Sequence, residues 1–139
     1  MAVGECGWEG CTCGDVREEN LSGAEVRVTS STGGQKGSKR ERHDLIPTTP
    51  LKLLAEQYGI GAEKYEQVNG RDNWRNGYPW SLSYAALQRH ARAFWSGEDY
   101  DPENGQPHLA AVAWHAFTLL HFMYAEDLPA EFDDRQEAR

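Results

Sequence analysis

The segment from His108 to Ala125 constrains the fold of this chain most, because its eighteen consecutive residues include no Asp, Glu, Lys or Arg. Its length reaches that of a membrane span. Three histidines, a threonine and several alanines nevertheless make it only weakly apolar. Pro107 stands where a helix can start, and Pro129 lies beyond its end. We therefore expect a helix buried inside a soluble bundle.

Helical periodicity predicts two further helices before this one. After Pro47, apolar side chains recur at steps of three and four residues from Leu51 to Tyr65, and Thr49 is the expected N-cap. A second helix is expected from Ser81, as its N-cap, to about Trp95. Residues 25–38 alternate like a short strand and then become rich in Gly and Ser. The predicted fold is all-α, with a bundle of three main helices preceded by a short β element.

Three helices of these lengths form a thin bundle. The third helix carries more apolar surface than two short neighbours can cover, so we expect a homo-oligomer that completes the core. The tails, residues 1–24 and 126–139, hold eleven of the 22 acidic residues and three of the 14 basic ones. We expect a disordered acidic N-terminal tail, one helical domain at residues 25–125, and an acidic C-terminal tail. Because the domain itself is neutral, binding to nucleic-acid polymers is not expected.

Three cysteines lie together near the N-terminus, at Cys6, Cys11 and Cys13. An odd number, with no apolar signal segment ahead of it, argues for a reducing, cytoplasmic compartment rather than a disulfide framework. A zinc knuckle completed by His43 stays open as an alternative. The paired spacing typical of structural zinc is missing, so free thiols are the favoured interpretation.

The loop between the second and third helices concentrates groups that can bind a cation. It carries four carboxylates within six residues and a histidine on each side: Glu98, Asp99, Asp101 and Glu103, with His90 and His108. An antiparallel helix pair brings both histidines toward the loop. Carboxylate oxygens are ligands that Mg²⁺ and Mn²⁺ prefer. The alternative is a solvated turn, in which acidic residues oppose the dipole of the following helix.

Basic and aromatic residues elsewhere can contact a phosphate-bearing ligand. The basic candidates flank or lie on the first two helices: Lys36, Lys64, Arg71 and Arg89. The Gly-rich segment 33–37 is loose enough to wrap a ligand with backbone N–H groups, yet it lacks the Gly-Lys-Ser/Thr ending of a P-loop. Aromatic side chains such as Trp74 can stack on a base, and they can equally well form core.

The order of short motifs along the chain points to a known family. In sequence these are Gly33 to Gly37, Arg42 to Pro47, Gly61 to Tyr65, Asn73-Trp74, Arg89-His90, Gly97 to Asp101 and His108 to Ala110. This ordered set resembles the phage dATP/dGTP diphosphohydrolase family in its N-terminal domain form, which is related to the MazG-like all-α nucleotide pyrophosphohydrolases. The resemblance covers roughly residues 25–125.

The resemblance implies hydrolysis of purine deoxynucleoside triphosphates to the monophosphate and pyrophosphate, with Mg²⁺ or Mn²⁺ as cofactor. It also implies the host cytoplasm as location if the protein is phage-encoded. One departure stands out. MazG-like enzymes bind metal through Glu-x-x-Glu and Glu-x-x-Asp pairs on helices, whereas the corresponding helices here offer Leu87 to His90 and His108 to Ala111. The Glu-x-x-Asp spacing occurs only in the loop, from Glu98 to Asp101.

We accordingly assign a hypothetical site. Glu98 and Asp101, assisted by His108 and His90, hold a divalent ion and activate water, with Glu63 as a further candidate ligand or base. The residues expected to contact substrate are Lys36, Lys64 and Arg89 at the phosphates and Asn73 and Trp74 at the base or sugar. Two alternatives remain open. One is a phage protein that binds or sequesters nucleotide without turnover, and the other is an interaction module with a solvated acidic loop.

Overall fold

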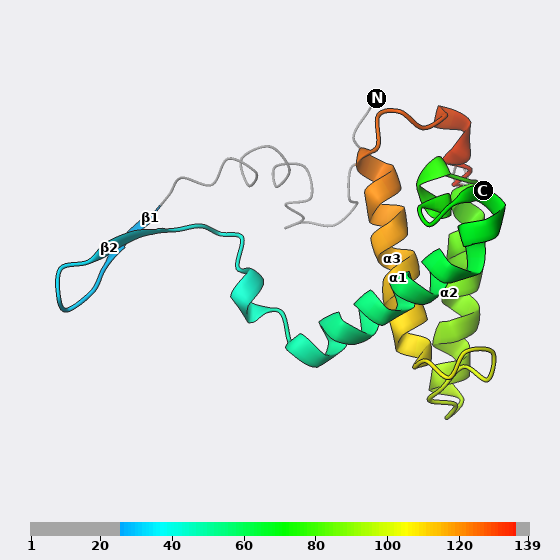
Figure 1. The fold of residues 1–139 in the computed structure, drawn as a ribbon, viewed down its shortest axis with the longest axis horizontal. Coiled ribbons are helices and arrows are strands. Elements are labelled where there is room, and N and C mark those ends of the chain that lie inside the picture. Colours follow the sequence, from blue (N-terminus) through cyan, green and yellow to red (C-terminus); the bar gives the residue numbers. More distant parts are fainter. Residues whose placement is uncertain (1–25, 136–139) are drawn as a thin grey trace, which may run out of the picture. The chain divides into compact units, whose positions relative to one another are not determined.

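The computed structural model describes residues 26–135, and the chain divides into two units, Met1–Ile46 and Pro47–Arg139. Three α-helices follow a short two-stranded antiparallel sheet, which confirms the predicted fold class (Figure 1). Cys6, Cys11 and Cys13, with the rest of the predicted N-terminal tail, lie outside the described residues.

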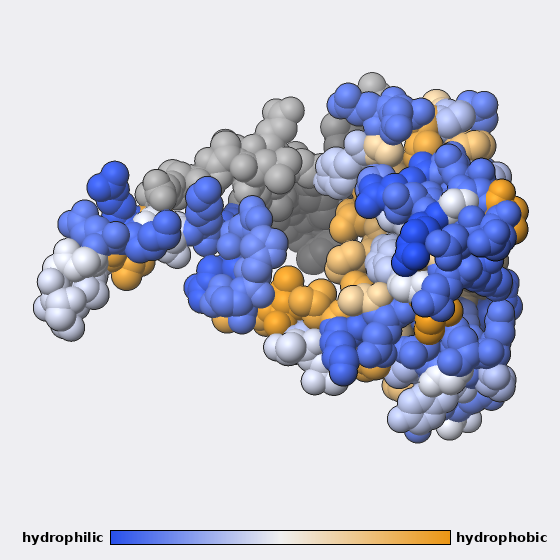
Figure 2. All heavy atoms as spheres, viewed as in Figure 1, coloured by the Kyte–Doolittle hydropathy of each residue, from blue (hydrophilic) through white to orange (hydrophobic). Residues whose placement is uncertain are grey.

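The first unit contains a β-hairpin. Strand β1 (Val26–Thr29) pairs with β2 (Gln35–Ser38), and the register sets Val26 opposite Ser38. A turn joins the strands through a hydrogen bond from the Ser30 amide to the Gly34 carbonyl, and Gly33 adopts a φ of 85° that side chains disfavour. The hairpin is exposed, and Figure 2 shows that its surface is mainly hydrophilic. A short 3₁₀ helix, η1 (His43–Leu45), follows.

The second unit contains the three main helices, each of which starts directly after a proline: α1 (Thr48–Asn69), α2 (Trp80–Trp95) and α3 (His108–Tyr124). Proline fits this position because its fixed φ suits the helix start. Thr49 and Ser81 therefore lie inside the first turn, and the prediction that they are N-caps is wrong. The ends were predicted more closely, since α2 stops at Trp95 and Gly97 follows with a φ of 98°.

Small side chains hold α2 against α3, and the two helices lie side by side in Figure 1. Ala86 on α2 and the pair Ala110 and Ala111 on α3 are buried, which lets the two backbones approach closely. Leu54 from α1 and Phe122 complete the buried apolar core. The core also contains three buried polar side chains: Ser83, His108 and Thr118.

A C-terminal segment packs against the turn that precedes α2. This turn follows the 3₁₀ helix η2 (Asn73–Asn76), and Gly77 within it lies against Leu128 and Phe132. The carboxylate of Asp134 accepts hydrogen bonds from the Ser81 amide and hydroxyl, at 2.9 and 2.5 Å. Residues of the predicted acidic tail thus contact the start of α2, and some of them belong to η3 (Ala130–Phe132).

Several apolar side chains of α3 are exposed, among them Leu109, Phe117, Leu120 and Tyr124. Hydrophobic patches are visible on the surface of the helical unit (Figure 2). Such a surface is consistent with the expected homo-oligomer, which stays a prediction. Among the described residues, no helix combines the length and the apolar character that a membrane crossing needs.

Candidate metal centre and adjoining pocket

The acidic loop between α2 and α3 is held by its own backbone. Tyr100 and Pro107 form an isolated antiparallel bridge, and the Asp101 amide donates to the Gln106 carbonyl at 2.8 Å. The Gly105 amide donates to the Asp101 carbonyl at 2.7 Å, and Oδ1 of Asp101 accepts from the Glu103 amide at 2.9 Å. Asp101 is therefore fixed by both its main chain and its side chain.

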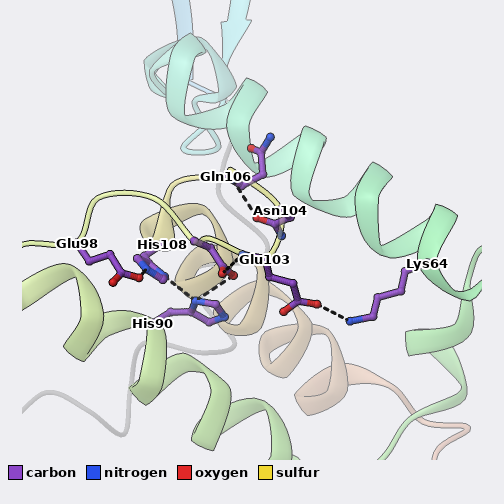
Figure 3. A network of polar contacts seen from close by, with 8 residues as sticks. Lys64, His90, Glu98, Glu103, Asn104, Gln106 and His108 are labelled. Carbon is purple, nitrogen blue, oxygen red and sulfur yellow. Dashed lines mark hydrogen bonds and ion pairs between the residues drawn. The ribbon is translucent and has the colours of Figure 1, made fainter.

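This loop brings one carboxylate and two imidazoles together. His90 comes from α2, Asp101 from the loop, and His108 is the first residue of α3; one potential ligand atom from each lies within 4.8 Å of the others. The Nδ1 atoms of His90 and His108 are 2.9 Å apart, and Nδ1 of His90 lies 3.9 Å from Oδ2 of Asp101. The side chains of Asp101 and His108 are 14% and 6% exposed. Figure 3 shows the side chains of His90 and His108 pointing toward one another.

Glu98 lies on the other side of the His108 ring. Its Oε1 accepts a hydrogen bond from Nε2 of His108 at 2.7 Å, as drawn in Figure 3. A proton on Nε2 leaves the lone pair on Nδ1, which faces His90 and Asp101. A carboxylate behind a ligating histidine is the usual arrangement at protein metal sites. Burial lowers the pKa of His90, an effect that neighbouring Asp101 opposes, and a neutral imidazole is the form that ligates a metal.

The three residues fit a divalent transition ion in donor chemistry and spacing. Adjacent ligands of an octahedral ion with bonds of about 2.1 Å are about 3.0 Å apart. The two Nδ1 atoms share a hydrogen bond at 2.9 Å, so an ion could take the place of the proton between them with little change in spacing. The separations that involve Asp101, 3.9 Å to Nδ1 of His90 and up to 4.8 Å to His108, need shifts of about 1–2 Å. Mixed imidazole and carboxylate donors suit Mn²⁺ better than Mg²⁺, which prefers oxygen ligands alone.

A pocket of about 340 Å³ adjoins this group. It is lined by five aromatic rings and several polar side chains, chiefly Tyr58, Tyr65, Trp74, Tyr78 and Trp114 with Arg71, Asn73, Ser83 and His115. The imidazole of His115 stacks on that of His90, with ring centroids 6.1 Å apart and planes inclined by 25°. His115 therefore links the pocket, which it lines, to His90 of the neighbouring group. Concave aromatic sites with a few convergent polar groups are typical of small-molecule binding.

A chain of hydrogen bonds joins three of the residues that line the pocket. The Ser83 hydroxyl, only 1% exposed, lies 2.7 Å from the Tyr78 hydroxyl and 3.1 Å from Nδ1 of His115. Burial lowers the pKa of His115 to about 4, with smaller contributions from His90 and Arg89. Burial also raises the pKa of Tyr78. Both rings are thus neutral at physiological pH.

A family model described as dATP/dGTP diphosphohydrolase, N-terminal, matches residues 30–135. The chain belongs to this family. The match contains the metal-ligand group, the pocket and the C-terminal segment, and it confirms the resemblance that the motif order predicted. No curated protein and no solved structure matches the chain significantly.

The remaining residues of the hypothetical site lie in several places. The Lys64 ammonium on α1 pairs with Glu103 at 3.1 Å, and this pair raises the pKa of Lys64 (Figure 3). Asn73 and Trp74 line the pocket. Arg89 is exposed on α2, and Glu63 is exposed on α1 and does not join the group of potential metal ligands. Lys36 is exposed on β2, in the N-terminal unit.

The hypothetical site did not include three pocket residues that are joined by hydrogen bonds: Tyr78, Ser83 and His115. His115 carried a usable signal, because seven residues separate it from His108 and two helical turns bring them to one face. Tyr78 was one of the aromatic residues that could stack on a base, whereas Ser83 carried no signal, since the hydrogen bond between them depends on the turn before α2.

Proposed function

We propose that this protein hydrolyses dATP and dGTP to the deoxynucleoside monophosphate and pyrophosphate with a divalent ion at His90, Asp101 and His108. The observation that carries the proposal is the position of His115, which lines the aromatic pocket and stacks on His90 of this group. A nucleotide has a flat apolar base and a charged triphosphate. The two neighbouring sites match these two parts, and the description of the family names a diphosphohydrolase.

The base enters between the aromatic side chains, with Trp74 and Asn73 at its edge or at the sugar. The triphosphate extends past His115 toward His90 and the loop. Lys64 and Arg89 supply positive charge for the phosphates. The Lys64 ammonium already lies beside the loop through its pair with Glu103, and a phosphate can replace that carboxylate because both groups of the pair are exposed.

His90, Asp101 and His108 would hold the divalent ion, which would neutralise phosphate charge and lower the pKa of a nearby water. Water forms a bond to the α-phosphorus, the bond from this phosphorus to the bridging oxygen breaks, and pyrophosphate leaves. Glu98, about half-exposed behind His108, orients the His108 ring through its hydrogen bond to Nε2, and the proton of the attacking water passes to solvent. Glu63 stays a further candidate base.

Incubation of the full chain with dATP or dGTP tests the proposal, with Mn²⁺, with Mg²⁺ and with a chelator. We expect monophosphate and pyrophosphate in equal amounts with Mn²⁺ and no product with the chelator. Asp101→Ala and Glu98→Ala should abolish turnover, whereas Asp99→Ala, a matched change in the same loop, should retain it. Absence of product from folded protein would sink the enzymatic function.

The same experiment separates the alternatives. A protein that only binds nucleotide would retain its ligand in the Asp101→Ala variant and show no turnover in any variant. An interaction module would show no nucleotide effect at all.

A further inference from the structure

We infer that the hydrogen-bonded chain Tyr78–Ser83–His115 contacts the six-substituent of a purine and can reverse the direction of its hydrogen bonds. One pocket then accepts both 6-amino and 6-oxo purines. The inference rests on the proposed function, which places a purine base in this pocket. It concerns how the pocket tolerates two bases, not how the phosphates are cleaved.

The Ser83 hydroxyl lies between two hydrogen-bonding partners. It lies 2.7 Å from the Tyr78 hydroxyl and 3.1 Å from Nδ1 of His115, and Ser83 is 1% exposed, so water does not compete. All three residues line the pocket. Because Nδ1 of His115 is occupied by Ser83, Nε2 is the ring nitrogen left for a ligand.

A chain of this composition can run in two directions. In the first direction, Tyr78 donates to Ser83 and Ser83 donates to Nδ1 of His115. The Tyr78 oxygen then accepts from a ligand while Nε2–H of His115 donates to it. In the second direction, Nδ1–H of His115 donates to Ser83 and Ser83 donates to Tyr78. The Tyr78 hydroxyl then donates to a ligand, and Nε2 of His115 accepts.

The two directions match the two purine edges. Adenine presents an amino donor next to the N1 acceptor, and guanine presents an oxo acceptor next to the N1–H donor. The first direction suits adenine and the second suits guanine. The change requires only rotation of two hydroxyls and a tautomer exchange of His115. A pocket with fixed donors would instead leave buried polar groups unpaired against one base, which strongly disfavours that base.

Free deoxynucleosides test this without phosphate or metal. Trp74 and Trp114 line the pocket, so their fluorescence should report binding to the full-length protein. The probes are deoxyadenosine, deoxyguanosine and purine 2′-deoxyriboside, which lacks a six-substituent. We expect the first two to bind within about fivefold of each other, and the third about tenfold more weakly.

Ser83→Ala removes the connecting hydroxyl. It should weaken deoxyadenosine and deoxyguanosine by a similar factor of about tenfold and weaken the unsubstituted nucleoside less, because that nucleoside keeps only the contact from N1 to His115. Ser96→Ala is the matched control, because it also removes a hydrogen-bonded serine hydroxyl, which donates to the Arg92 carbonyl, and Ser96 does not line the pocket. This variant should leave the affinities for all three nucleosides unchanged.

Three outcomes would overturn the inference: binding of only one of the two natural nucleosides, an equal loss of all three in Ser83→Ala, or binding of none. The proposed function is judged separately. If the protein hydrolyses nucleotide but does not show the expected relative affinities for the three nucleosides, only this inference is wrong. If the three nucleosides bind with the expected relative affinities but no nucleotide is hydrolysed, the enzymatic function is wrong and the base pocket stands.

Discussion

Replacing Gly77 with alanine should destabilise the helical unit more than the same replacement at Gly70. Both glycines follow a helix and adopt nearly the same backbone conformation, with φ and ψ of 78° and 161° at Gly77 and of 86° and 170° at Gly70. This region is accessible almost only to glycine, and a side chain there costs about 1–3 kcal/mol at either position.

The surroundings of the two positions differ. A Cβ at Gly77 would lie 2.9 Å from Cδ2 of Leu128 and 3.1 Å from Cδ2 of Phe132, whereas a Cβ at Gly70 meets nothing within 4 Å. Displacing packed side chains costs about 1–3 kcal/mol. Gly77→Ala should therefore lower the free energy of unfolding by about 1–3 kcal/mol more than Gly70→Ala does.

Urea unfolding followed by circular dichroism measures both variants. Adding Leu128→Ala should recover part of the excess loss in the Gly77→Ala background and none in the Gly70→Ala background. Equal destabilisation by the two glycine replacements would refute the packing of residues 128–132 against the turn before α2. Because Tyr78 follows Gly77 directly, Gly77→Ala should also weaken deoxynucleoside binding.

Three further outcomes follow from the site. The pKa of His115, about 4 in the folded chain and near 6.5 when unfolded, means that the unfolded chain takes up a proton first as the pH falls. Metal-free protein should thus lose about 1–2 kcal/mol between pH 6.5 and 4 after allowance for screening, and His115→Gln should show a shallower loss in urea titrations. Asp101→Asn should weaken Mn²⁺ binding at least about tenfold by calorimetry, whereas equal affinity in Asp101→Asn and the control Asp99→Asn would exclude Asp101 as a ligand. Lys64→Gln should raise KM for dGTP with little change in unfolding free energy, since the pair with Glu103 is exposed; an unchanged KM would remove Lys64 from the phosphate site.

The helices could be predicted from sequence because each follows a proline and carries the apolar spacing of its buried face. The short β element was predictable for a similar reason, since alternation precedes a Gly-rich turn. The caps were not predictable in the same way. Ser81 has the residue type of an N-cap, yet its hydroxyl bonds Asp134, 53 residues later. A tertiary contact of this range leaves no local sequence signal.

One part of the candidate site could be predicted from sequence, and the pocket beside it could not. His90, Asp101 and His108 lie close together in sequence around one loop, so an antiparallel helix pair was enough to bring them together. The sequence did not separate the role of Glu98 from that of Asp101, because which ring nitrogen of His108 each one faces depends on the path of the loop. The pocket combines residues of α1, η2, α2 and α3, and its lining depends on packing angles that periodicity does not contain.

The central claim is that this chain cleaves nucleotide at the α-phosphorus. Turnover of dGTP in heavy-oxygen water with Mn²⁺, followed by mass spectrometry of both products, tests it most directly. We expect dGMP that carries the heavy oxygen, unlabelled pyrophosphate, and no turnover in Asp101→Ala. Label in the pyrophosphate, release of single phosphate, or no product from folded protein with bound Mn²⁺ would contradict it.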